Sequence, residues 1–254
     1  MNRYLGSFTP YKTDKNDIIV FNPKTQKWER YWKFVELKND TLLLSVEDSL
    51  LLRYKKLRYE IDPDAEFFDQ IVYSSSGCYG SCPIIDISLN KDGDILFQGE
   101  GYVEPLGFYS TKTDQKATKF IFEKFKRAGP QKLHDVYLAN YTDGEEITTT
   151  FIKNGKIIKT IADYGKKAPK DLLWAYIPLG NLHNAVHLEP FPQELPYYPK
   201  LSVFTFSKNG RKLLLAKSES FYLWTELKKS KSTEKSFKPI YELSLSSNSV
   251  YFGP

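Results

Sequence analysis

The chain has 254 residues, of which 41% are hydrophobic and 26% are charged. This composition excludes an intrinsically disordered protein, and the length allows one large domain or two small ones. The net charge of +5 is small and diffuse, so it does not predict a nucleic acid as a partner. The high content of Tyr (18), Phe (17) and Trp (4) favours a protein rich in β-strands.

The one local concentration of lysines lies in residues 228–238, and it lacks the interleaved aromatic side chains of a nucleic-acid surface. We interpret it as a solvated loop. No stretch reaches the roughly 18 apolar residues of a membrane span, so we expect no integral membrane segment. The first residues also lack the hydrophobic core of a signal peptide.

Two compartments are compatible with this start of the chain. We expect a cytoplasmic protein if Met1 is native, and a periplasmic or cell-envelope protein if Met1 replaces a leader that was removed. The sequence leaves the oligomeric state open.

The first 66 residues are predicted to form a β-rich segment. Four stretches have the pattern of strands and no helical period separates them; they are residues 17–22, 27–37, 41–47 and 51–61.

Three turn sequences further along the chain predict β-hairpins. An Asp-Gly or Asn-Gly pair supplies the two positive φ angles of a type I′ turn, whose twist suits paired antiparallel strands. The turns are KDGD at 91–94, KNGK at 153–156 and KNGR at 208–211, and strand-like segments flank each of them.

Two segments have helical patterns. Residues 113–129 carry apolar side chains at four-residue spacing, with Gly129 in the place of a C-terminal cap. The second helix begins near Pro169, a favourable position for the first turn, and we expect Pro178 to break or kink it.

These patterns predict an α+β fold, in which an antiparallel sheet built from hairpins carries two helices on one face. We expect three parts: a β-rich segment 1–66, an α+β domain 67–190 and a β-rich segment 191–254. The last segment follows a proline-rich stretch and is predicted to consist of strands to the end. The first and last parts are candidates for pairing into one discontinuous β unit.

The only two cysteines, Cys78 and Cys82, lie in the stretch GCYGSCP, 77–83. Redox motifs usually separate the thiols by two residues and place the first at a helix N-terminus, whereas here the spacing is three and a strand pattern follows. We therefore favour a structural disulfide, because Gly80 gives the turn backbone freedom. So short a loop contributes only about 2 kcal/mol in the chain-entropy model. In a reducing cytoplasm two free thiols are expected instead.

A zinc site that combines these cysteines with His183 and His187 is disfavoured, because roughly one hundred residues separate the two pairs. We interpret the histidines as partly exposed side chains on a short helix. The acidic residues of 141–146 lack the spacing of a calcium loop and are interpreted as a turn with solvated carboxylates. No nucleophile elbow or phosphate-binding loop is present in the sequence. We therefore predict no catalytic residue, no metal ligand and no cofactor.

From about residue 75 to residue 187 the chain resembles an uncharacterised bacterial family, a domain of unknown function. The likeness rests on GCYGSCP, on the two hairpins at KDGD and KNGK, and on a helix after each hairpin. Ile85 departs from the family pattern, which usually has an aromatic residue two positions after the proline. Many members look like exported or lipid-anchored envelope proteins, so the resemblance implies an oxidising compartment. It implies no activity, ligand or catalytic residue.

Our leading hypothesis is a non-catalytic binding or interaction protein of the bacterial cell envelope, with another protein as the expected partner. Tyrosine and tryptophan on strands supply the rigid amphipathic contact area that is enriched at interfaces. Two alternatives remain. One is an immunity-type protein that neutralises a toxin from a competitor, and the other is a thiol-dependent redox protein that uses Cys78 and Cys82.

Overall fold

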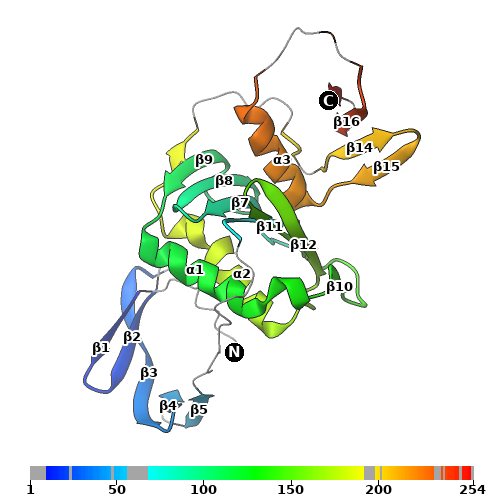
Figure 1. Ribbon diagram of the computed structural model, residues 1–254. Helices are drawn as coiled ribbons and strands as arrows, with labels where there is room; N and C mark the ends of the chain where they lie inside the picture. Colours follow the sequence, from blue (N-terminus) through cyan, green and yellow to red (C-terminus); the bar gives the residue numbers. More distant parts are fainter. Residues whose placement is uncertain are drawn as a thin grey trace. The chain divides into compact units, whose positions relative to one another are not determined.

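The chain divides into two compact units, residues 1–62 and 63–254. The computed structural model describes residues 10–22, 25–46, 49–55, 68–191, 198–200, 202–231, 236, 238–245 and 248–252 (Figure 1).

The first unit contains a five-stranded antiparallel sheet in which each strand pairs with the next along the chain. Val20 and Leu44 are its buried hydrophobic residues. The predicted strands are confirmed in their described parts, and a further strand precedes them; residues 56–61 lie outside the described residues. The strands are β1 (Tyr11–Asp14), β2 (Asp17–Asn22), β3 (Lys27–Lys38), β4 (Thr41–Val46) and β5 (Leu50–Lys55).

The second unit is built around an eight-stranded sheet with the order β10-β12-β11-β6-β7-β8-β9-β13 (Figure 1). All neighbouring strands are antiparallel except β10 and β12, which are parallel. The strands are β6 (Gln70–Ser75), β7 (Ile84–Asn90), β8 (Asp94–Gly101), β9 (Gly107–Lys112), β10 (Val136–Leu138), β11 (Glu146–Lys153), β12 (Lys156–Tyr164) and β13 (Glu189–Pro190).

Both predicted helices are confirmed. Helix α1 (Gln115–Ala128) begins at Asp114, whose side chain accepts a hydrogen bond from the backbone of Ala117, and ends at Gly129 with a left-handed φ of 59°. Helix α2 (Lys170–Gly180) begins after Pro169 and continues through Pro178 for two more residues. Short 3-10 helices follow each of them at Pro130–Lys132 and Leu182–Asn184. Among the described residues, no helix has the length and apolar character to cross a membrane.

Helices α1 and α2 cover one face of the eight-stranded sheet, and the larger hydrophobic core lies beneath them. Alternation along β7 places Ile85, Ile87 and Leu89 in this core. The helices contribute Ile121 and Leu172, which are fully buried. The predicted arrangement of two helices on one face is therefore observed.

A third helix, α3 (Lys217–Lys229), corrects the prediction that residues 191–254 contain only strands. Its aromatic residues are of types that favour β-strands. Phe221 and Trp224 nevertheless lie three positions apart, which places them on the same side of a helix, and both are buried. The Glu219 carboxylate accepts a hydrogen bond from the backbone of Ala216 at 2.9 Å, which stabilises the first turn.

Helix α3 packs on the face of the sheet opposite to α1 and α2. A smaller hydrophobic core there joins α3 to Val72, Phe108 and Ile152. A separate four-stranded sheet of the second unit has the order β15-β14-β16-β17; its strands are β14 (Thr205–Lys208), β15 (Arg211–Leu214), β16 (Tyr241–Leu245) and β17 (Asn248–Phe252). The described strands at the two ends of the chain therefore belong to two different sheets.

The three predicted hairpins are confirmed, but one turn type is wrong. At KNGK and KNGR both central residues have positive φ, as a type I′ turn requires. At KDGD only Gly93 has a positive φ, of 86°. Asn90 explains the difference, because its side-chain oxygen accepts hydrogen bonds from the backbones of Asp92 (3.0 Å) and Asp94 (2.9 Å) and so holds another turn in place.

Candidate functional site

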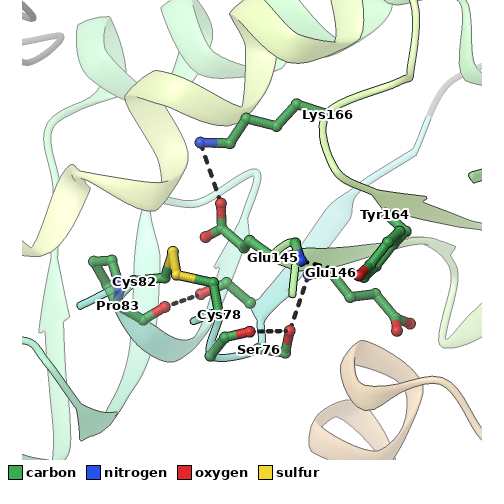
Figure 2. The surroundings of a disulfide bond; sticks show 11 residues. Ser76, Cys78, Cys82, Pro83, Glu145, Glu146, Tyr164 and Lys166 are labelled. Atoms are coloured by element: carbon green, nitrogen blue, oxygen red, sulfur yellow. Dashed lines mark hydrogen bonds and ion pairs between the residues drawn. A yellow bond between two sulfur atoms is a disulfide. The ribbon is translucent and has the colours of Figure 1, made fainter. Parts of the chain in front are cut away.

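The GCYGSCP turn joins β6 to β7 and is anchored at both ends (Figure 2). The Ser75 hydroxyl donates a hydrogen bond to the carbonyl of Pro83 at 2.7 Å. Ser76 pairs with Glu146 of β11 twice: its backbone N–H donates to the Glu146 carbonyl at 2.8 Å, and its hydroxyl accepts from the Glu146 N–H at 2.9 Å. These bonds fix the base of the turn to the end of the sheet.

Within the turn, the Sγ atoms of Cys78 and Cys82 lie 1.97 Å apart, at disulfide distance, and the two Cα atoms are 5.5 Å apart. Gly80 between them has a φ of 141°, which side chains rarely tolerate. Neither cysteine stands at a helix N-terminus, so no helix dipole acts to stabilise a thiolate. The geometry fits the predicted structural bridge better than it fits a reactive thiol.

A pocket of ≈ 550 Å³ lies beside this turn and reaches the start of helix α3. Ser76 and Gly77 before the cysteines and Ile84 after them contribute to its wall, so the signature turn of the sequence forms one side of the pocket. The apolar lining is Gly77, Ile84, Val203, Leu215 and Ala216, and the polar lining is Ser76, Glu146, Thr148, Ser202 and Lys217.

Glu145 and Glu146, neighbours on the chain, differ in their surroundings (Figure 2). The Glu145 carboxylate forms an ion pair with Lys166 at 3.2 Å, and its side chain is only 11% exposed. Glu146 points the other way and lines the pocket. The interpretation of residues 141–146 as a turn with solvated carboxylates is therefore wrong for Glu145.

A buried ionic cluster lies next to the pocket, where Lys217 at the start of α3 meets two carboxylates of the sheet. Its ammonium group is 2.7 Å from Asp86 on β7 and 2.7 Å from Glu100 on β8. The two carboxylate side chains are 3% and 0% exposed. The Tyr198 hydroxyl contacts both carboxylates, at 2.7 Å for Glu100. A charge buried this deeply needs a counter-charge and hydrogen bonds, and the cluster supplies both.

The two carboxylates of the cluster have opposite pKa shifts. Burial raises the pKa of Asp86, and the nearby charge of Glu100 adds to this effect against the attraction of Lys217. Burial alone would also raise the pKa of Glu100, but the charge and hydrogen bonds of Lys217 outweigh it and hold that pKa below its usual range. Burial alone would lower the pKa of Lys217, but the charges and hydrogen bonds of the two carboxylates have the larger effect and raise it.

The contacts of the Tyr198 hydroxyl are compatible with a proton on one carboxyl group of the cluster. The Tyr198 hydroxyl has a single hydrogen but hydrogen-bonds to oxygen atoms of both Asp86 and Glu100. Either this hydrogen is shared between the two carboxylates, or one carboxyl group is itself protonated and donates to Tyr198. Of the two carboxyl groups, Asp86 is the better candidate for such a proton, because burial raises its pKa whereas Lys217 lowers that of Glu100. The cluster then holds one negative and one positive charge, which suits a buried position.

His183 and His187, the two histidines considered as zinc ligands, do not form a pair on one helix. His183 is only 7% exposed and stacks on Phe97 with ring centroids 4.7 Å apart, so its interpretation as partly exposed is wrong. Burial lowers the pKa of His183. The 3-10 helix ends at Asn184, before His187. In the described part of the chain, no group of three or more His, Cys, Asp or Glu side chains is placed to hold a metal ion.

The cysteine turn was predicted from the sequence, but the ionic cluster beside it was not. Asp86 and Glu100 gave one signal, since each is a charged residue inside a segment that was predicted to be a strand. No sequence pattern pointed to Tyr198 or Lys217, because both lie more than ninety positions from the carboxylates along the chain. Lys217 also stands in a segment that was predicted to be a strand.

Residues 69–183 match the family model described as a domain of unknown function, DUF6438. The match confirms the resemblance to such a domain and covers helices α1 and α2 and strands β6 to β12. Tyr198 and Lys217 lie beyond it, so the cluster joins the matched domain to the segment that follows. Searches of the curated proteins and of the solved structures found no match.

Proposed function

We propose that this protein is a non-catalytic binding protein of the bacterial cell envelope, and that it holds its ligand in the pocket beside the Cys78–Cys82 turn. The observation that carries the proposal is the pocket itself. Its volume of ≈ 550 Å³ is in the range of small-molecule sites. It combines apolar walls with hydroxyl groups and one carboxylate, a lining that is typical of such sites.

The pocket is built from parts that are held in place independently of a ligand. The Ser76–Glu146 bonds fix one wall, and the backbone of Ser218 donates to the Thr148 hydroxyl at 3.0 Å on the other side. A wall that is already ordered loses little conformational entropy when a ligand binds. This rigidity supports a binding site that exists before its ligand arrives.

The pocket can be tested by filling it. The Ala216→Phe variant places a large side chain in the pocket wall, while Lys116→Phe adds the same side chain to an exposed position of helix α1 and serves as the control. A panel of cationic, anionic and neutral aliphatic compounds is screened by saturation-transfer NMR. We expect compounds that bind the wild type and Lys116→Phe to lose binding to Ala216→Phe. Binding that Ala216→Phe leaves unchanged would contradict the proposed site.

The proposed compartment is supported by the position of Cys78 and Cys82 at disulfide distance, because such bonds persist in oxidising compartments. It is tested by alkylating thiols in intact cells of the source organism with a maleimide polymer before lysis. We expect a native protein that gains label only after treatment with a reductant. Two thiols that react without reductant would contradict a location in the envelope.

A further inference from the structure

We infer that the ligand of this pocket carries an alkylammonium group, and that the Glu146 carboxylate binds that group. The inference rests on the proposed binding function and adds the chemical class of the ligand. It follows from the charges that line the pocket, from the surroundings of each charge and from the apolar walls between them.

Only two of the lining residues, Glu146 and Lys217, carry a charge. The Lys217 ammonium group already contacts two carboxylates at 2.7 Å, and the side chain is 15% exposed. Its charge is neutralised within the cluster, so it offers little to an anionic ligand. Glu146 therefore decides the sign of the charge that the pocket favours.

The Glu146 carboxylate forms no ion pair or side-chain hydrogen bond within the part of the chain that the structure describes. Its backbone is nevertheless fixed, since both its N–H and its carbonyl are bonded to Ser76. A carboxylate on an anchored backbone, at the edge of a pocket, is a suitable partner for a positively charged group. Glu145 provides the contrast, because Lys166 already satisfies its charge.

The rest of the lining fits the chain to which an ammonium group is attached. Ile84, Val203 and Leu215 offer apolar surface that an aliphatic chain can cover. A ligand with a carboxylate in the same place would meet the negative charge of Glu146 and lose its own hydration without compensation. The lining thus favours an aliphatic amine over an aliphatic acid of the same size.

The alkylammonium group could belong to a free small amine or to a lysine side chain of another protein, since the two share this chemistry. Two probes separate the sources. The first is n-pentylamine, which is protonated at pH 7, and the second is Nα-acetyl-lysine N-methylamide, which presents the same group on a peptide backbone. Tighter binding of the first supports a free amine as the ligand, and tighter binding of the second supports a lysine.

The test compares n-pentylamine with 1-pentanol and pentanoate, which have nearly the same size and differ in charge. Dissociation constants are measured by NMR titration on the wild type, on Glu146→Gln and on Glu145→Gln, with circular dichroism to show that all three are folded. Because Glu146 is exposed, we expect the wild type to bind pentylammonium about two- to fivefold more tightly than pentanol, and pentanoate weakest. Glu146→Gln should lose this preference, and Glu145→Gln should keep it.

Three results would overturn the inference: equal affinity for the amine and the alcohol, preference for pentanoate, or an unchanged preference in Glu146→Gln. If pentanol or pentanoate binds and Ala216→Phe removes that binding, the proposed pocket stands and only the ligand class is wrong. If no compound of this set or of the wider panel loses binding in Ala216→Phe, the proposed function itself fails.

Discussion

The two faces of the eight-stranded sheet differ in how many charged and hydroxyl side chains they bury. The face under α1 and α2 carries mainly large hydrophobic residues, such as Ile87, Phe97 and Phe151, all of which are fully buried. The opposite face, which we call the α3 face, carries Asp86, Glu100, Thr148 and Thr150 in addition to its smaller hydrophobic core. The same alternation along each strand produces both faces.

The difference shows where specific interactions are required in this protein. On the face under α1 and α2, close packing of apolar side chains predominates, and buried Asp163 adds hydrogen bonds from the backbones of Lys167 and Ala168. On the α3 face many buried polar groups have a hydrogen-bond partner, such as the Thr150 hydroxyl, which meets that of Ser218 at 2.8 Å. The ionic cluster and the pocket both lie on the α3 face, so the candidate site belongs to this face. The opposite face contains the larger hydrophobic core.

The largest predicted effect comes from removing the ammonium group of Lys217, which is the cation of the cluster among the described residues. Lys217→Met removes the ammonium group that contacts both buried carboxylates, and we expect a loss of about 3–5 kcal/mol in the free energy of unfolding at pH 7. Urea denaturation measures this loss. The control is Lys212→Met at an exposed position of β15, which should change stability by less than about 0.5 kcal/mol. Equal effects of the two variants would show that the cluster does not stabilise the α3 face.

The stability of the wild type should depend on pH because of the same cluster. The pKa of Glu100 is lowered from 4.5, so its contribution is present above that pH and is lost as the pH falls through the folded value. The pKa of Lys217 is raised from 10.5, so its contribution is present below that pH and is lost as the pH rises through the folded value. Burial also raises the pKa of Tyr176 and Tyr198 and adds to the loss of stability at high pH, so in Lys217→Met we expect the alkaline part of this profile to become smaller. A profile identical to that of the wild type would contradict the assignment.

A smaller effect is expected from the turn that forms one wall of the pocket. The double variant Cys78→Ser, Cys82→Ser should lose about 2 kcal/mol, since the bridge closes only a short loop. Thermal or urea denaturation with and without a reductant measures this loss. A reductant should lower the stability of the wild type to that of the double variant. A loss well above this figure would mean that the turn stabilises more than its own loop.

The smallest effect is predicted for Asp86→Asn, which tests the proton that we assign to Asp86. An asparagine amide can donate to Tyr198 as a protonated carboxyl does, while its oxygen still accepts from Lys217. We expect a change below about 1 kcal/mol, against about 3–5 kcal/mol for Glu100→Gln, which removes the remaining counter-charge of Lys217. Comparable losses in both variants would contradict this assignment.

Local sequence patterns predicted much of the second unit. Glycine-containing turns located all three hairpins, and the spacing of apolar residues located α1. The pattern failed at α3 because Phe221 and Trp224 favour strands as isolated residues, and only burial against the sheet selects the helix. The turn at KDGD also escaped prediction, since the Asn90 side chain decides its type and no dipeptide rule includes it.

The candidate site was predicted only in part. The cysteine turn was visible because its glycines and cysteines are adjacent in the sequence. The pocket and the cluster depend on contacts between β7, β8 and residues more than ninety positions further along the chain. Such contacts follow from how the last segment covers the α3 face, and a single sequence carries no local signal for them.

The most direct test of a ligand site on the α3 face is a titration of the ¹⁵N-labelled wild type with n-pentylamine, followed through its backbone amide signals. We predict that the signals of Gly77, Glu146 and Ala216 move together with one dissociation constant. Those of Ile121 and Leu172, on the opposite face, should stay in place. Movement confined to helices α1 and α2, or no movement in any of these signals, would contradict the assignment of the site to this pocket.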